Sequence, residues 1–238
     1  MTRITAEVSM VKVISLGGSI VAPQEVDTGF VKRFVLLIQS YLDGDAHRRL
    51  VFVVGGGGPA RTYQQAYRSI SDDPVETEQD WIGIAATRLN GQLIKAVFHD
   101  LCVDPLVTDP TAQVTFSGRI LVAAGWKPGF STDYDAVLLA ERFKADSVVN
   151  LSNIEKVFTA DPRKEPTARP LDRASWTEFR ELVGDTWKPG ANYPFDPIAA
   201  KKAAELQLRV VVAAGRNLEN LRAILEGRPF SGTEIGPE

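Results

Sequence analysis

The sequence predicts an α/β protein built on a central, mostly parallel sheet. Short apolar runs rich in β-branched residues alternate with segments of helical periodicity along most of the chain. The apolar runs are continuous, without the alternation of a half-exposed strand, which indicates strands buried on both faces. No repeat and no low-complexity linker interrupts the 238 residues, so we expect a single compact domain.

The apolar and helical patterns also place the individual elements. Strands are expected at residues 11–16, 50–54, 120–124, 147–151 and 209–213. Helices are expected at residues 27–42, 79–98, 133–143 and 218–225, and another is expected to begin at 196–197. Asp27 and Asp196 are the expected N-caps of two of these helices. Two polar segments that contain proline, residues 72–78 and 162–173, are expected to be surface loops.

Composition and charge disfavour several classes of protein. The chain carries 27 basic and 30 acidic residues without a basic run, so we expect no nucleic-acid partner. No segment approaches the roughly 20 apolar residues that cross a bilayer, and the N-terminus does not read as a signal peptide. The single cysteine, Cys102, suits a reducing compartment. We therefore expect a soluble, cytoplasmic protein without a membrane partner.

Two expected strands end in glycine-rich loops, VISLGGS at residues 13–19 and VFVVGGGGPAR at residues 51–61. Glycine lets a backbone approach a phosphate closely, and the N–H groups at a helix start can then bind it. Arg61 adds a planar fork of donors beside the second loop. Neither loop has the spacing of a P-loop or of a dinucleotide-binding motif. The alternative interpretation is that the glycines only permit tight turns.

A third loop, GWKPGFSTD at residues 125–133, also joins an expected strand to an expected helix. Ser131, Thr132 and Asp133 place two hydroxyls and a carboxylate at the helix start. This pattern indicates either an ordinary N-cap or a set of polar substrate contacts. His47 and His99 fit no metal-ligand spacing, so we expect no metal site made by protein side chains alone.

At these loops the chain resembles the amino acid kinase family and, within it, the archaeal-type UMP kinases. The motifs are LGGS at 16–19, VGGGGPAR at 54–61, GWKPGFSTDYDAV at 125–137 and NLSNIEKVFTADPRKEPTA at 150–168. DWIG at 80–83, TRLNGQL at 87–93 and FDPIAAKKA at 195–203 support the same branch. The resemblance implies a three-layer αβα sandwich that transfers the γ-phosphoryl group of ATP to UMP, with Mg²⁺ accompanying the ATP.

The resemblance also implies roles for individual residues. UMP would be bound by Gly56, Asp80, Trp126, Lys127, Pro128, Gly129, Phe130, Ser131 and Thr132. ATP would be bound by Gly18, Ser19, Gly57, Arg61, Ser152, Phe158 and Asp161. Arg61 and Lys201 would act on the transferring group. Asp133, the third candidate catalytic residue, could orient a water on Mg²⁺ or contact the uridine, and the alternative interpretation is that it only caps the helix. An N-terminal half, about 1–145, would hold the acceptor and a C-terminal half, about 146–238, would hold ATP. The resemblance further implies a homo-oligomer, often a hexamer.

The chain departs from the family pattern at three places. Ser15 stands where many relatives carry a lysine, which removes one charge stabiliser. Trp126 and Lys127 replace smaller or polar residues of the acceptor pocket. Glu155-Lys156 replaces a turn that usually contains glycine, and because lysine tolerates positive φ poorly we expect a changed turn there.

Two other functions remain open at this point. One is a sibling kinase for another small phosphate or carboxylate. Isopentenyl phosphate kinases are similar, but the histidine that they place after the second glycine loop is missing from residues 62–67. The other is a nucleotide-binding storage protein of the molybdenum-storage type, in which Ser15 and the altered turn would be tolerated.

Overall fold

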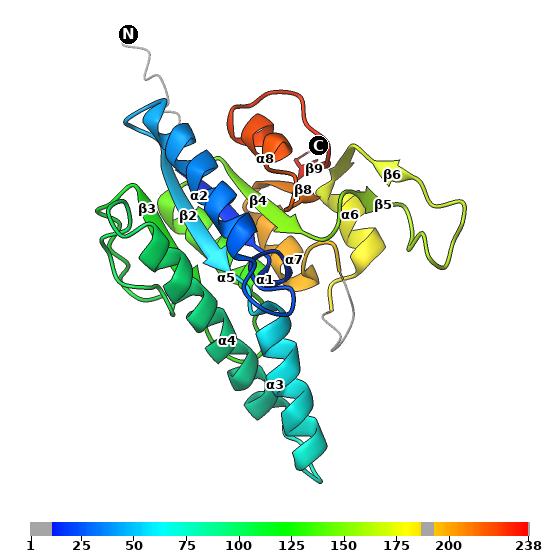
Figure 1. The fold of residues 1–238 in the computed structure, drawn as a ribbon. Coiled ribbons are helices and arrows are strands. Elements are labelled where there is room, and N and C mark those ends of the chain that lie inside the picture. The colour runs from blue at the N-terminus through cyan, green and yellow to red at the C-terminus, as the bar shows by residue number, and fades with distance from the viewer. Residues whose placement is uncertain (1–10, 187–192, 238) are drawn as a thin grey trace.

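A seven-stranded sheet forms the centre of the computed structural model, which describes residues 11–186 and 193–237 (Figure 1). Its strands are β1 (Val11–Leu16), β2 (Arg49–Val54), β3 (Ile120–Ala124), β4 (Ser147–Ser152), β7 (Arg173–Ser175), β8 (Arg209–Ala214) and β9 (Thr233–Gly236). The spatial order is β3-β2-β1-β4-β8-β9-β7. Strands β3, β2, β1, β4 and β8 run parallel, β9 is antiparallel to β8, and β7 is parallel to β9. The prediction of a mostly parallel sheet is confirmed.

The five predicted strands are present at their expected positions to within one residue. Their continuous apolar runs are explained by burial on both faces of the sheet. In β2, for example, Val51 and Val53 face one core while Phe52 and Val54 face the other, and all four side chains are buried. A strand of this kind cannot alternate with polar residues, because neither of its faces meets water.

Four short strands, one helix and one single helical turn escaped the sequence analysis. They are β5 (Val157–Phe158), β6 (Pro170–Leu171), β7, β9, α6 (Trp176–Val183) and the turn at residues 18–21. The expectation of a loop throughout residues 162–173 is therefore wrong at its C-terminal end, where β6 and the start of β7 lie. Strands of two to four residues are too short to show a period, so only pairing with a neighbour reveals them.

The remaining helices are α1 (Gly18–Val21), α2 (Thr28–Asp43), α3 (Gly57–Ile70), α4 (Glu76–Val97), α5 (Thr132–Phe143), α7 (Pro197–Glu205) and α8 (Leu218–Leu225). The predicted N-caps are confirmed, because the Asp27 carboxylate accepts the N–H of Phe30 and the Asp196 carboxylate accepts that of Ala199. Helix α4 begins before residue 79, so the loop expected at 72–78 is wrong for residues 76–78. The acidic residues in this first turn stabilise the helix, because their negative charge lies at the positive end of the helix dipole.

The sheet separates two hydrophobic cores, which makes the molecule the expected three-layer sandwich. One core packs β-strand side chains against α2, α4 and α8, and contains the aromatic group Phe34, Phe52 and Phe98. The other packs the opposite face against α5, α6 and α7, with Phe179 and Phe195 fully buried. The predicted αβα architecture is confirmed, and its layers fix the loops at the carboxyl ends of the parallel strands.

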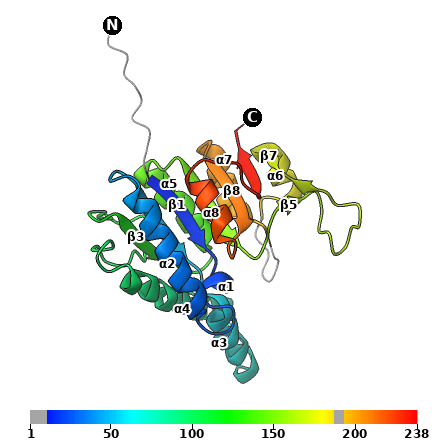
Figure 2. The same cartoon turned by 45° about the horizontal axis from the view of Figure 1, so that its top comes forward.

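Helices α3 and α4 pack against each other and extend beyond the carboxyl edge of the sheet (Figures 1 and 2). Because α3 starts directly after β2, the beginning of this helix lies beside the second glycine loop. The helix therefore carries its first residues to the edge where parallel α/β proteins bind ligands. Within the described residues, no helix combines the length and the apolar character that crossing a membrane requires.

Candidate active site

The two glycine loops lie in direct backbone contact at the carboxyl edge of β1 and β2. A Cβ atom added to Gly18 would lie 2.1 Å from the backbone nitrogen of Gly57, and one added to Gly55 would lie 2.5 Å from that of Gly18. Gly57 also has a φ of +65°, which side chains disfavour. Glycine is therefore required because two chain segments meet there, which a single isolated turn would not demand.

Asn90 on α4 holds the second glycine loop in place. Its buried Nδ2 donates to the backbone oxygens of Gly55 at 2.8 Å and Gly56 at 3.0 Å. The N–H of Gly58 donates to the carbonyl of Ala22, which ties this loop to the end of α1. These bonds hold the loop in place, and they do not use the side of the loop that faces the adjoining cavities.

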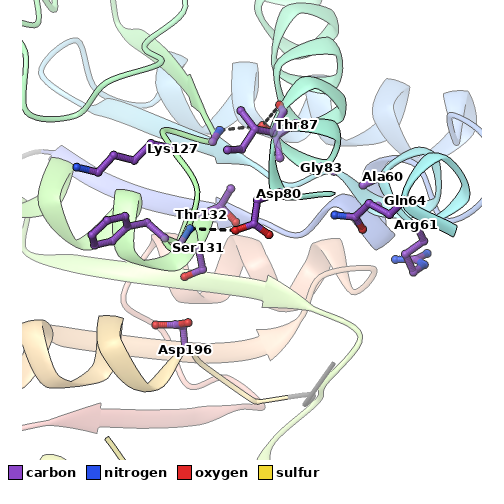
Figure 3. Close-up of a pocket in the computed structure, with 16 residues that line it drawn as sticks. Ala60, Arg61, Gln64, Asp80, Gly83, Thr87, Lys127, Ser131, Thr132 and Asp196 are labelled. Carbon is purple, nitrogen blue, oxygen red and sulfur yellow. Dashed lines mark hydrogen bonds between the residues drawn. The ribbon is translucent and has the colours of Figure 1, made fainter. Parts of the chain in front are cut away.

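One cavity of about 350 Å³ opens between the second glycine loop, α4 and the loop after β3 (Figure 3). Its wall is made by Gly56, Gly57, Ala60, Arg61, Gln64, Asp80, Gly83, Ile84, Thr87, Gly125, Lys127, Gly129, Phe130, Ser131, Thr132 and Asp196. We call it the acceptor cavity. Lys127 and Arg61 lie at opposite ends of the group of side chains in Figure 3.

Most of the residues predicted to bind UMP line this cavity, but two do not. Trp126 and Pro128 are not part of its wall in the described residues. The Trp126 ring packs on Phe130 with 5.1 Å between centroids, and the Lys127 ammonium lies 3.8 Å from the Trp126 ring centre. Trp126 therefore supports the wall from behind. Gly57, predicted for the ATP side, lines the acceptor cavity instead.

A second cavity of about 1130 Å³ opens between the first glycine loop and the segment that follows β4. Of the residues predicted to bind ATP, its wall contains Gly18, Ser19, Arg61, Ser152, Phe158 and Asp161. It also contains the cationic side chains of Lys156, Arg163 and Lys164. We call it the donor cavity.

Arg61 and Thr132 line both cavities, so the two spaces adjoin at these residues. The Arg61 guanidinium is exposed and donates to the carbonyl oxygen of Pro23 at 2.9 Å, which leaves further N–H groups for a ligand. Thr132 is the first residue of α5, so the positive end of a helix of 12 residues faces the same place. A phosphoryl group at this junction would meet a cation and a helix N-terminus.

Asp133 lies beside the junction and is not the N-cap of α5. That position belongs to Ser131, whose hydroxyl accepts the N–H of Tyr134, so the capping interpretation of Asp133 is wrong. One Asp133 oxygen accepts the Ser15 hydroxyl at 2.8 Å and the other accepts the N–H of Asp196 at 3.2 Å. Desolvation raises the pKa of the Asp133 carboxyl to about 6, partly offset by the bond from Ser15.

Asp196 was predicted only as a helix cap, yet it also lines the acceptor cavity. Burial raises the pKa of its carboxyl group. Lys201, predicted to be catalytic, is exposed on α7 and lies outside the walls that the described residues give to either cavity. Its charge acts on Asp185, whose pKa is lowered chiefly by its bond with Arg180.

The turn at Glu155-Lys156 is built without a strained backbone. Lys144 and Gln207 are the non-glycine residues with positive φ in the described parts of the chain, and Lys156 is not among them. The Lys156 ammonium instead pairs with Asp172. Phe158 follows in β5 and pairs with Pro170 of β6. The turn therefore needs no glycine at this position.

Sequence reasoning missed several side chains of the acceptor cavity, among them Gln64 and Thr87. Gln64 lies three residues after Arg61 on α3, and Thr87 lies seven residues after Asp80 on α4. Helical spacing puts each pair on one face, so the period could have identified both once the helices were known. The contribution of Asp196 carries no such signal, because it reaches the cavity from a distant part of the chain.

Glycine loops at the carboxyl edge of a parallel sheet, with two cavities meeting at an arginine and a helix N-terminus, define a phosphate-handling α/β protein. Comparison with known proteins gives the particular family. The chain belongs to the amino acid kinase family, whose profile matches residues 10–214.

Individual relatives are similar over almost the whole chain. The uridylate kinase of Methanospirillum hungatei is 35% identical across 94% of this chain and 93% of its own. The crystal structure of uridylate kinase from Archaeoglobus fulgidus has a TM-score of 0.80 at 32% identity, covering 94% of this chain and 99% of that one. The UMP kinase of Bacillus anthracis superposes with a TM-score of 0.75 over 96% of both chains, but at 20% identity it shows the fold alone.

Proposed function

We propose that this protein is a nucleoside-monophosphate kinase that transfers the γ-phosphoryl group of ATP to UMP. The observation that carries the proposal is the junction of the acceptor and donor cavities at Arg61 and Thr132. Relatives that are at least 30% identical over 94% of this chain are uridylate kinases, which supports UMP as the acceptor. Storage-type binding is less well supported, because the similar proteins named above are uridylate or UMP kinases.

UMP would lie in the acceptor cavity with its phosphate toward the junction. Gly56, Arg61 and the start of α5 supply backbone donors and positive charge there. Asp80 and Phe130 would contact the ribose and the base. Asp80 already accepts the N–H of Gly129 at 3.0 Å through one oxygen, which leaves its second oxygen for a ribose hydroxyl.

ATP would lie in the donor cavity. Gly18 and Ser19 at the start of α1 would contact its phosphates, while Ser152, Phe158 and Asp161 would hold the adenosine half. Phosphoryl transfer asks mainly for alignment of the attacking oxygen and neutralisation of charge on the moving group. Arg61 supplies the cation at the junction, so no covalent nucleophile is required.

Ser15 and Asp133 would shape the centre of the reaction. The Ser15 hydroxyl takes the place of the lysine common in the family and bonds Asp133 directly. Asp133 also accepts the N–H of Asp196, which lines the acceptor cavity. We therefore assign Asp133 the role of orienting groups around the transferring phosphoryl, and we assign the charge neutralisation to Arg61. A catalytic role for Lys201 would require a movement of α7 or of its side chain.

Mg²⁺ fits this arrangement as a companion of ATP. Asp133, Ser15 and Ser19 place a carboxylate and two hydroxyls on the wall of the donor cavity, and oxygen donors are the ligands that Mg²⁺ prefers. In the described part of the chain, no group of three or more His, Cys, Asp or Glu side chains could hold a metal. When bound, Mg²⁺ would neutralise negative charge on the phosphates of ATP.

We also propose a homo-oligomer, a hexamer in view of the family resemblance, that works in the cytoplasm. Light scattering at several protein concentrations would measure the assembly, and a mass equal to one chain throughout would rule the oligomer out. The division into an acceptor half and an ATP half is likewise a proposal. Asp196, beyond residue 145, contributes to the acceptor cavity, so the division would not be strict.

The decisive experiment is a coupled ADP-release assay with Mg·ATP and a panel of UMP, CMP, dUMP and isopentenyl phosphate. A preference for UMP of about 10-fold or more over each competitor is expected, because one buried polar contact is worth about 1–3 kcal/mol. If every acceptor left ADP release at background while ATP still bound, the storage interpretation would replace the kinase. A preference for isopentenyl phosphate would instead indicate a sibling kinase.

A further inference from the structure

The loop of residues 125–131, which we call the acceptor loop, is held by side chains from two helices. The Gly125 N–H donates to the Thr87 hydroxyl at 2.8 Å, and the Trp126 N–H donates to Asp135 at 3.2 Å. The Gly129 N–H donates to the carboxylate of Asp80 (Figure 3). The loop therefore owes its position to α4 and α5 as much as to its own sequence.

Arg88 on α4 completes this set by binding the two carbonyl groups at the start of the loop. Its Nε donates to the oxygen of Gly125 at 3.3 Å, and its Nη2 donates to that of Trp126 at 3.0 Å. The side chain is half-buried, and its guanidinium lies 5.9 Å from the ring centre of Trp81. A planar fork can bind two neighbouring acceptors at once, whereas an ammonium group is a single point charge.

The start of the acceptor loop consequently has every backbone polar group paired. Gly125 and Trp126 each use their N–H on one side chain and their carbonyl on Arg88. Paired peptide groups resist rotation, because breaking a bond to a partly buried partner leaves a polar group unsatisfied. The residues that follow, including Lys127 and Phe130, are thus presented to the cavity in one orientation.

We infer that Arg88 is a positioning residue that sets the shape of the acceptor site through the backbone of Gly125 and Trp126. It is not part of the cavity wall in the described residues, so it would act without touching the acceptor. The inference rests on the proposed function only in naming UMP as that acceptor. Its structural content is that Arg88 keeps residues 125–131 ordered before a ligand arrives, which lowers the entropy lost on binding.

The test compares Arg88→Lys and Arg88→Ala with the control Arg142→Ala. Arg142 makes the same kind of contact elsewhere, donating to the carbonyls of Pro110 at 3.2 Å and Thr111 at 3.1 Å. Both Arg88 variants are expected to raise KM for UMP about 10-fold or more, since small displacements of binding groups cost up to about 100-fold. KM for ATP should change less than about 2-fold in all three variants, because neither arginine belongs to the wall that the described residues give to the donor cavity.

Amide hydrogen exchange of residues 125–131 gives a readout that does not depend on activity. Faster exchange there in Arg88→Lys, with no such change in Arg142→Ala, is expected. Unchanged exchange together with an unchanged KM for UMP would overturn the inference. If the wild-type protein fails to phosphorylate UMP, the proposed function fails, but the exchange result still decides the role of Arg88. Arg88→Lys keeps the charge and the aliphatic stem, so it serves if the alanine variant does not fold.

Discussion

The acceptor and donor cavities differ in the hydrogen bonds that hold the loops at their walls. Around the acceptor cavity, backbone groups of residues 125–129 are bonded to side chains of α4 and α5. The wall of the donor cavity includes Asp161 and Arg163, which are bonded to each other on the surface. The loop at the acceptor cavity is thus hydrogen-bonded to two helices of the sandwich. The wall of the donor cavity consists in part of residues that bond only to a near neighbour in the sequence.

If the proposed function holds, we expect this difference to place selectivity on the acceptor side. A wall held by hydrogen bonds favours ligands that fit it, because a misfitting ligand leaves buried polar groups unpaired. ATP would be held largely through its phosphates by the glycine-loop backbone, which needs less from the surrounding side chains. Substitutions should therefore affect the acceptor and the donor to different extents, and the junction should affect both.

The largest effect is expected for Arg61→Ala at the junction. Removing the cation that both cavities share should lower kcat about 100- to 1,000-fold, the range seen when a preorganised charge stabiliser is lost. Thermal stability should change little, because Arg61 is exposed. Steady-state kinetics and a melting curve measure both. The control Arg68→Ala, further along α3, should keep its activity, and a near-normal kcat for Arg61→Ala would remove the junction from the mechanism.

Asp133→Asn should lower kcat by about 10- to 100-fold, as expected for a group that orients others in the transition state. Asparagine keeps the size of the side chain but loses the charge that the Ser15 hydroxyl and the Asp196 N–H recognise. Because the aspartate carboxyl is desolvated, the variant should fold at least as stably as the wild-type protein. Activity equal to wild type across a range of ATP and UMP concentrations would contradict the assignment.

The raised pKa of Asp135, which bonds the acceptor loop, predicts that the stability of the protein depends on pH. The side chain is buried, one of its oxygens has no hydrogen-bond partner, and burial raises its pKa to about 7. An ordinary aspartate titrates near 4, so between about pH 4 and pH 7 the folded protein holds a proton that the unfolded chain has lost. The free energy of unfolding should therefore fall as pH rises through this window and level off above it.

The variant Asp135→Asn tests this sign, since it removes the titration. Urea unfolding at pH 5 and pH 8 should show a loss of stability on raising the pH that is smaller in the variant by about 1–3 kcal/mol, given about 1.4 kcal/mol per pKa unit. The exposed substitution Asp73→Asn is the control and should leave the pH profile unchanged. Parallel profiles for Asp135→Asn and wild type would contradict the raised pKa.

The smallest effect is expected on the donor side, for Asp161→Asn. The Asp161–Arg163 pair lies at the protein surface, where such pairs contribute little, so KM for ATP should rise only about 2- to 5-fold. KM for UMP should not change. A rise in KM for ATP of about 100-fold would show that the donor wall is as demanding as the acceptor wall, and the comparison between the cavities would break.

Much of the fold was predictable because its signals are local. Continuous apolar runs marked β1, β2, β3, β4 and β8, and Asp27 and Asp196 marked two helix starts. The short strands β5, β6, β7 and β9 were missed since they exist only through pairing. The capping box of Ser175 and Glu178, which starts α6, was a local signal that was available and overlooked.

The residues of the candidate site also fall into those that the sequence predicted and those that it did not. The glycine loops and most residues of the acceptor loop were recognisable from their motifs. The placement of Gly57 in the acceptor cavity, the position of Trp126 behind its wall and the location of Lys201 outside both walls were not. A motif gives the identity of a residue, but the direction in which that residue faces depends on the elements packed around it.

By itself, the sequence determined the buried parallel strands, the glycine loops that end two of them, and the family to which the chain belongs. The tertiary structure alone decided that Gly18 touches Gly57, that Ser15 bonds Asp133 across 118 residues of chain, and that Arg88 binds the acceptor loop 37 residues further on. The physical reason is the separation along the chain between the residues that interact. Strand burial and helix caps arise from neighbours along the chain, whereas contacts between distant segments depend on how the sheet and its two helical layers pack.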